Sequence, residues 1–160
     1  MLKVVSNTTP IISLLKINQL EVLQELYKEI YVPNEVFQEV EAGKSKNFYE
    51  DLSKLEWVNI VKIKDEVAVK SFIDLDAGEA EAIILASEIN ADLIILDEKL
   101  GRLYATNMGL RITGTIGVLI KAKQSGLLSN IRPLIDELIN QGIWINEKLK
   151  HEVLKIVGEI

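Results

Sequence analysis

The sequence contains no cysteine among its 160 residues, which limits both its covalent chemistry and its metal chemistry. No disulfide can form, and no thiolate can bind a metal ion. This composition is compatible with a reducing compartment, and we expect a cytoplasmic protein. The single histidine, His151, argues against a zinc hydrolase and against a serine–histidine triad.

Long apolar runs are also missing. No stretch reaches the roughly 18 apolar residues that a membrane span needs, so we expect no membrane partner. The N-terminus enters a strand-like segment at once, without a signal-peptide pattern. No repeat, linker or low-complexity tract interrupts the chain, so we expect a single domain over residues 1–160.

The chain does contain an uneven distribution of charge. Its net charge is −6, and an acidic protein is a poor general binder of nucleic acid because phosphates repel it. Residues 99–135, however, hold no aspartate or glutamate. The basic residues of this segment are Lys99, Arg102, Arg111, Lys121, Lys123 and Arg132. The pattern is compatible with a local anion-binding face and equally with ordinary solvated side chains.

Strand-like and helix-like segments alternate along the chain. Runs of β-branched and apolar residues predict strands at 2–6, 30–32, 57–63, 92–96 and 111–113, the third of them at a sheet edge. Periodicity and capping residues predict helices at 11–15, 20–27, 34–40, 79–90, 98–107, 115–124, 130–140 and 146–157. Thr115 is the expected cap of its helix. This alternation predicts an α/β fold with a small parallel sheet covered on both faces, whose sites form outside the carboxyl ends of the strands.

Several carboxylates fall near those strand ends. Asp97 and Glu98 directly follow the buried run 93–96, and Asn7 follows the first strand. Glu39 and Glu79 lie on neighbouring helices and can reach the same edge. Carboxylates with few histidines are the oxygen ligands that Mg²⁺ prefers, and such an ion promotes displacement at phosphorus.

Each acid also has an ordinary structural explanation. Negative charge at the start of a helix, as at Glu79, gains up to about 1 kcal/mol from the helix dipole. Asp97 could cap the following helix, and Glu39 could be a solvated surface residue. The residues alone leave both explanations open.

Three groups of motifs together resemble the PIN-domain family. They are residues 4–10 (VVSNTTP) and 31–33 (YVP) with Glu39, then 75–83 (LDAGEAEAI) and 93–97 (LIILD), then 113–119 (TGTIGVL). The likeness covers residues 2 to about 140. Within the family, the chain resembles a bacterial and archaeal branch related to the VapC-type toxins.

The resemblance implies a PIN-like three-layer α/β/α fold and an endoribonuclease that uses Mg²⁺ or Mn²⁺ to hydrolyse RNA in line, leaving a 5′-phosphate. It implies Glu39, Glu79 and Asp97 as the acidic cluster, with Glu98 as a further metal ligand. It also implies that the enzyme is the toxin of a toxin–antitoxin pair, with a small antitoxin protein as partner and a homodimeric state.

The resemblance and the charge pattern also suggest residues that hold RNA. Lys99, Arg102 and Arg111 are candidates for the RNA backbone. Thr8 and Thr115 match hydroxyl positions near the site and could hold a ligand or water. The RNA target cannot be deduced, because specificity lies in loop shape rather than in a motif.

Asn7 departs from the family pattern, because PIN domains usually carry a carboxylate at this catalytic position. An amide oxygen can bind Mg²⁺, but it brings no charge and cannot act as a base. Losing one charge weakens metal binding and also lowers repulsion among the remaining acids. The domain is therefore either a nuclease of lower metal affinity or a binding module that pairs with an antitoxin or RNA without cleaving it.

Two other α/β enzymes fit the sequence less well. A phosphatase of the haloacid dehalogenase type needs an aspartate nucleophile after the first strand, where Asn7 stands. A dinucleotide-binding domain needs a glycine-rich turn after a strand, and none is present.

Overall fold

The structure is a computed structural model that describes residues 2–160, so the first residue of the predicted 1–160 domain lies outside it. Five strands form one sheet. They are β1 (Val4–Ser6), β2 (Ile30–Pro33), β3 (Val58–Val61), β4 (Leu93–Ile95) and β5 (Ile112–Thr113). Their order is β3-β2-β1-β4-β5, and every neighbouring pair is parallel. The predicted edge position of β3 is confirmed.

Eight α-helices connect and follow the strands. They are α1 (Thr8–Lys16), α2 (Val22–Tyr27), α3 (Asn34–Glu41), α4 (Ala77–Glu88), α5 (Lys99–Asn107), α6 (Thr115–Gln124), α7 (Arg132–Asn140) and α8 (Glu147–Ile156). Every predicted helix and strand is present, with bounds shifted by at most about three residues. Two short 3₁₀ helices, η1 (Leu52–Lys54) and η2 (Glu66–Ser71), were not predicted. Within residues 2–160 no helix is long and apolar enough to cross a membrane.

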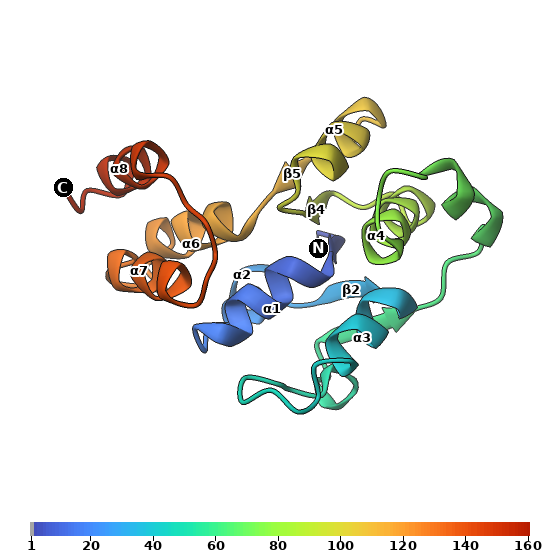
Figure 1. Cartoon of the computed structure of the whole chain (residues 1–160), viewed down its shortest axis with the longest axis horizontal. Coiled ribbons are helices and arrows are strands. Elements are labelled where there is room, and N and C mark those ends of the chain that lie inside the picture. Colours follow the sequence, from blue (N-terminus) through green and yellow to red (C-terminus); the bar gives the residue numbers. More distant parts are fainter. Residues whose placement is uncertain (1) are drawn as a thin grey trace.

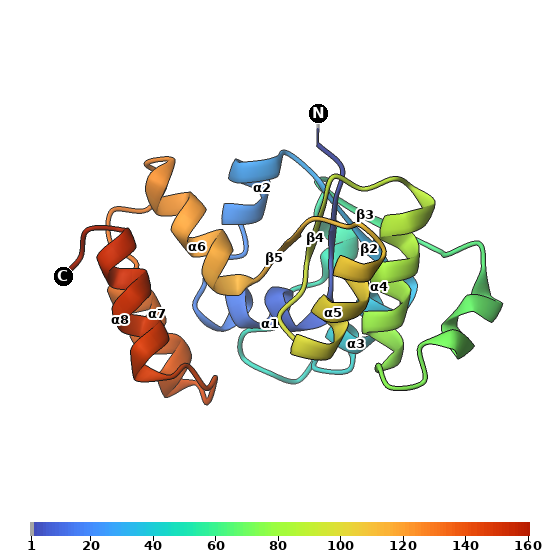
Figure 2. The same ribbon diagram turned by 90° about the horizontal axis from the view of Figure 1, so that it is seen from above.

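The helices cover both faces of the sheet. Successive strand residues point to opposite faces, so Val4 enters one apolar core and Val5 enters the other. The first core also contains apolar residues of α1, α2, α3, α6, α7 and α8, and the second contains those of α4 and α5. Figures 1 and 2 show α4 and the α7–α8 pair at opposite ends of the molecule. The predicted three-layer α/β/α fold is confirmed.

The strand order reverses direction between β1 and β4. The chain builds β1, β2 and β3 outward to one side, then crosses back to place β4 and β5 on the other. Ser6 pairs with Ile95, and the Asn7 N–H donates to the Ile95 carbonyl over 3.0 Å. The residues that follow β1 and β4 therefore meet at one rim, where parallel sheets usually bind their ligands.

The predicted cap at Thr115 is wrong, and the alternative role of Asp97 as the cap of α5 is not observed. The N-cap of α6 is Gly114, and Thr115 is the first residue of that helix. The N-cap of α5 is Glu98, whose side chain makes no capping bond, so Asp97 does not cap α5. Thr115 instead donates hydrogen bonds from its backbone N–H and its hydroxyl to the Asp97 carboxylate across the rim.

Candidate functional site

Asn7 lies at the centre of the rim, where β1 ends. Its side chain is 2% exposed, and its Nδ2 donates to Glu98 Oε2 over 3.4 Å. The Thr9 hydroxyl donates to the other oxygen of Glu98 over 2.7 Å. The start of α1 therefore fixes the Glu98 carboxylate beside the end of β1.

Glu39 connects three helices. From α3, its carboxylate accepts hydrogen bonds from the Thr8 hydroxyl of α1 and from the Gly78 N–H of α4, the latter over 3.1 Å. A Cβ at position 78 would overlap the Glu39 carboxylate, so any other residue there would force Glu39 to move. Burial raises the pKa of Glu39 above its usual value, partly offset by the Thr8 hydrogen bond. Glu39 is therefore a half-buried, bonded carboxylate and not a free surface residue.

Glu79 occupies the first turn of α4 and is 6% exposed. The helix is capped by Asp76, whose side chain accepts from the Glu79 N–H over 2.8 Å. Burial, with Asp76 and then Glu98 adding negative charge, raises the pKa of Glu79 to about 7. This environment disfavours the charged form, so attraction to the helix dipole does not explain the position.

Asp97 lies after β4 and faces the start of α6. Its Oδ1 accepts from the Thr115 N–H over 2.7 Å, and its Oδ2 accepts from the Thr115 hydroxyl over 2.6 Å. A Cβ at position 114 would lie 2.6 Å from Asp97 Oδ1 and 3.4 Å from Arg102 Nη1. The absence of a side chain at Gly114 therefore leaves room for the Asp97 carboxylate and the Arg102 guanidinium near this turn.

The structure brings the predicted acids to one rim but gives each its own partners. Asn7 and Glu98 are in contact, and Glu79 lies within electrostatic range of Glu98. Glu39 bonds to the residue next to Asn7, while Asp97 is held by Thr115. Across the described residues 2–160, no three aspartate, glutamate or histidine side chains lie close enough to hold one ion.

Two buried oxygens at this rim bear on whether the site can hold a divalent cation. Asn7 Oδ1 and Glu79 Oε2 are buried and find no hydrogen-bond partner in the part of the chain that the structure describes. Buried acceptors are nearly always satisfied, and leaving one without a partner costs about 1–3 kcal/mol. Both are hard oxygen donors of the type that Mg²⁺ and Mn²⁺ bind. The residues present therefore fit a divalent cation, with the Asn7 amide replacing one carboxylate.

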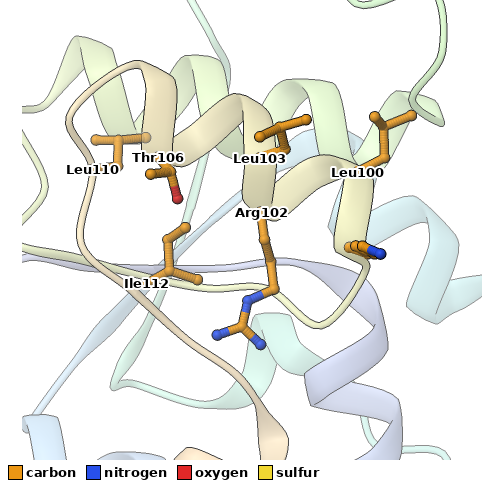
Figure 3. Close-up of a pocket in the computed structure, with 7 residues that line it drawn as sticks. Leu100, Arg102, Leu103, Thr106, Leu110 and Ile112 are labelled. Carbon is orange, nitrogen blue, oxygen red and sulfur yellow. The ribbon is translucent and has the colours of Figure 1, made fainter.

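The predicted RNA-binding cations lie in different places. Lys99 and Arg102 are exposed on the first turn of α5, beside the rim. Figure 3 shows Arg102 leaving α5 on the side of Ile112, while Leu100 and Leu103 project elsewhere. Arg111 precedes β5 and so lies at the opposite end of that strand from the rim. The structure does not bring Arg111 to the carboxylates.

Five residues that shape the site were not identified from the sequence. They are Thr9, Asp76, Gly78, Gly101 and Gly114. A Cβ at position 101, in α5, would lie 2.7 Å from Glu79 Oε2. Glycine inside a helix costs about 1 kcal/mol relative to alanine, so Gly78 and Gly101 were a usable signal of close approach.

A family model described as a PIN domain matches residues 3–159. No curated protein matches the chain.

Proposed function

The chain belongs to the PIN-domain family, whose members are usually nucleases that bind RNA and use divalent metals, and we propose that it is a metal-dependent endoribonuclease. The observation that best supports this is the pair of buried, unpartnered oxygens, Asn7 Oδ1 and Glu79 Oε2, at the carboxyl ends of the strands. Buried oxygens without a partner are rare, so this pair is the best candidate in the described residues for holding an ion.

Glu79, Glu98 and the amide oxygen of Asn7 would hold a Mg²⁺ or Mn²⁺ ion, with Glu39 and Asp97 completing the acidic surroundings. Such an ion would lower the pKa of water and neutralise charge on the phosphate. Asp97 and Glu39 are already oriented by Thr115 and by Thr8 and Gly78. Oriented groups of this kind lower the barrier because they need not rearrange during the reaction.

The proposed reaction is hydrolysis of an RNA phosphodiester. A bond forms between water and phosphorus, the bond from phosphorus to the 3′ oxygen breaks, and that oxygen gains a proton. The products carry a 5′-phosphate and a 3′-hydroxyl. Because the pKa of Glu79 is about 7 in the metal-free protein, its carboxyl must release a proton before it can hold a cation at neutral pH.

The RNA backbone would lie along the first turn of α5. Arg102 and Lys99 are exposed there, and the guanidinium of Arg102 lies beside Gly114 and the Asp97 carboxylate. Arginine forms paired hydrogen bonds with phosphate oxygens, so Arg102 is the stronger candidate of the two. Thr8 and Thr115 already donate to carboxylates, and we propose that they orient those acids rather than contact RNA directly.

An RNA cleavage assay tests the proposal. We expect the parent protein to cut single-stranded RNA with Mn²⁺ or Mg²⁺ and to be inactive with EDTA. Glu79→Gln and Asp97→Asn should each lower the rate by about 100-fold or more, as loss of one electrostatic group typically does. The control is Glu25→Gln, an exposed acid on α2 at the opposite side of the sheet from the rim. Equal cleavage by parent and Asp97→Asn would contradict the residue assignment.

One observation favours a second candidate, a PIN-like module that binds without cleaving. Asn7 replaces a carboxylate, and no three acids of residues 2–160 converge on one point. Calorimetric titration with Mn²⁺ separates the candidates. Binding at micromolar to low millimolar metal supports the nuclease, whereas its absence in that range supports the module.

We also propose that the domain is a homodimer and the toxin of a toxin–antitoxin pair. Support for a dimer comes from α5, where Leu100 and Leu103 are exposed beside a hollow of about 630 Å³ (Figure 3). Exposed apolar patches often mark protein interfaces. Leu103 is 56% exposed, so Leu103→Lys should leave the fold intact and shift the mass measured by light scattering from dimer to monomer. A parent protein that is already monomeric would contradict the dimer.

A further inference from the structure

A second hollow, of about 410 Å³, opens directly beside the rim. Its polar lining includes Asp97, Arg102 and Thr115, and its apolar lining includes Leu138, Ile145 and Leu149 from the C-terminal part of the chain. Its volume lies within the range of sites that enclose small ligands. It is therefore large enough for a planar group such as a nucleobase.

Trp144 stands at this hollow with almost its whole side chain in solvent. It lies between α7 and α8 and is 83% exposed, whereas the other tryptophan, Trp57, is 8% exposed and packs in the core. Burial in the fold therefore does not explain the indole ring of Trp144. A large aromatic surface of this kind gains free energy when a flat apolar partner covers it.

Arg102 supplies the matching charge. Its Nη1 lies 3.4 Å from the position of a Cβ at Gly114, next to Asp97 Oδ1. Arg102 forms no salt bridge with an acid of the described residues 2–160. Its guanidinium donors are therefore free for an anionic group that lies between the hollow and the acids.

We propose that this hollow binds one unstacked nucleobase of single-stranded RNA, next to the phosphate at the rim, with Trp144 stacking on the base and Arg102 holding the adjoining phosphate. The inference rests on the proposed function and adds a base-binding subsite to it. A base inside a duplex cannot leave its stack to enter a hollow of this size without breaking its pair. Trp144 and Arg102 would thus select single-stranded RNA over duplex RNA.

Because Asp97 lines the hollow, a nucleobase next to the RNA phosphate is favoured as its occupant over a protein segment. Arg102 and Trp144 both line the hollow, and they offer a cation and an aromatic surface beside Asp97. A nucleotide carries an anion and a flat apolar ring joined through one sugar, so one nucleotide supplies a partner for each. A purely apolar peptide would leave Arg102 without an anionic partner, and an acidic amphipathic peptide is the competing occupant that the test separates from RNA.

Binding of a short fluorescent single-stranded RNA, measured by anisotropy in EDTA at one fixed ionic strength, tests this inference without cleavage. Stacking on one aromatic ring is worth about 5- to 150-fold in affinity. We expect Trp144→Leu to weaken binding within this range and Trp144→Phe to retain most of it. Because the ring is so exposed, Trp144→Leu should leave the urea midpoint unchanged.

A second arm removes the base instead of the ring. The base is removed from one position of the RNA at a time. At one position its removal should weaken binding to the parent protein but should not change binding to the Trp144→Leu variant. A duplex of the same sequence should bind parent and variant equally. Equal affinity of parent and Trp144→Leu for the single strand would overturn the inference. So would quenching of Trp144 fluorescence by an acidic amphipathic peptide but not by the RNA, which would assign the hollow to a protein ligand.

The experiments distinguish a failure of this inference from a failure of the proposed nuclease function. If the protein binds RNA through Trp144 but never cleaves it with Mn²⁺, the inference stands and the nuclease proposal fails. If the protein cleaves RNA and Trp144→Leu binds as tightly as the parent, the nuclease proposal stands and the inference fails.

Discussion

Asp97 accepts two hydrogen bonds from one residue, Thr115: the backbone N–H bonds to Oδ1 over 2.7 Å and the hydroxyl bonds to Oδ2 over 2.6 Å. Both bonds span 18 residues of sequence and join the end of β4 to the first turn of α6. The carboxylate is thereby held in one orientation by the first residue of the helix that follows β5.

Removing the hydroxyl should loosen this carboxylate. We expect Thr115→Val to lower the free energy of unfolding by about 1–3 kcal/mol, because a charged acceptor loses a donor in a partly buried place. The RNA cleavage rate should fall as well. Thr115→Ser keeps the hydroxyl and should retain most of both properties. Urea denaturation and the cleavage assay measure the two effects, and equal values for Val and Ser would show that the hydroxyl does not position Asp97.

Gly78 should tolerate no side chain, although it lies in a helix. Alanine normally stabilises a helix by about 1 kcal/mol relative to glycine. Here a Cβ would lie 2.3 Å from Glu39 Oε1, so we expect Gly78→Ala to destabilise the protein by about 1–3 kcal/mol. The matched control is Gly43→Ala, whose Cβ would meet nothing closer than 3.5 Å. Denaturation midpoints compare the two, and a stabilised Gly78→Ala protein would contradict the contact.

The raised pKa of Glu79 should make stability depend on pH. The folded protein keeps a proton on Glu79 up to a pH of about 7, whereas the unfolded chain loses it near the ordinary glutamate pKa of 4.5. The folded state therefore binds more protons between these values, and stability should fall as pH rises through this window. The burial that raises the pKa of Glu39 acts in the same direction. Glu79→Gln should flatten the curve measured by urea denaturation in EDTA, and Glu25→Gln should not.

Replacing Asn7 by aspartate should lower the stability of the metal-free protein and raise its affinity for Mn²⁺. Asn7→Asp removes the donor to Glu98 and places a second negative charge beside it, so the protein in EDTA should unfold at lower urea concentration. Mn²⁺ should bind more tightly, by about tenfold or more, since an added unit charge a few ångströms from a divalent ion is worth several kcal/mol at intermediate dielectric. Calorimetry gives the affinity. Weaker Mn²⁺ binding than in the parent would place the ion elsewhere.

The fold could be predicted from the sequence because each element carries its own local signal. The buried run 93–96 and the cap at Asp76 mark their strand and helix without reference to the rest of the chain. The rim could be predicted too, since parallel strands end on the same side. Arg111 was misplaced because the charge pattern does not tell which end of β5 a residue occupies.

The detailed contacts could not be predicted, because they join residues far apart in sequence. Thr9 and Glu98 are 89 positions apart, and nothing in either local sequence indicates their bond. Thr115 is of a residue type that is favoured at helix N-caps, yet its hydroxyl donates to Asp97 and does not cap its own helix. Trp144 lies in an apolar stretch that favours burial, and only the packing of α7 and α8 leaves it in solvent.

The rim is built from segments that begin at Asn7 and end only at Thr115. During synthesis Asn7 leaves the ribosome first, and the residue that orients Asp97 leaves it last. A nascent chain that has not yet emerged past the start of α6 therefore lacks the complete rim. Under the proposed function, cleavage of RNA would have to wait until the residues up to Thr115, almost three quarters of the chain, have left the ribosome.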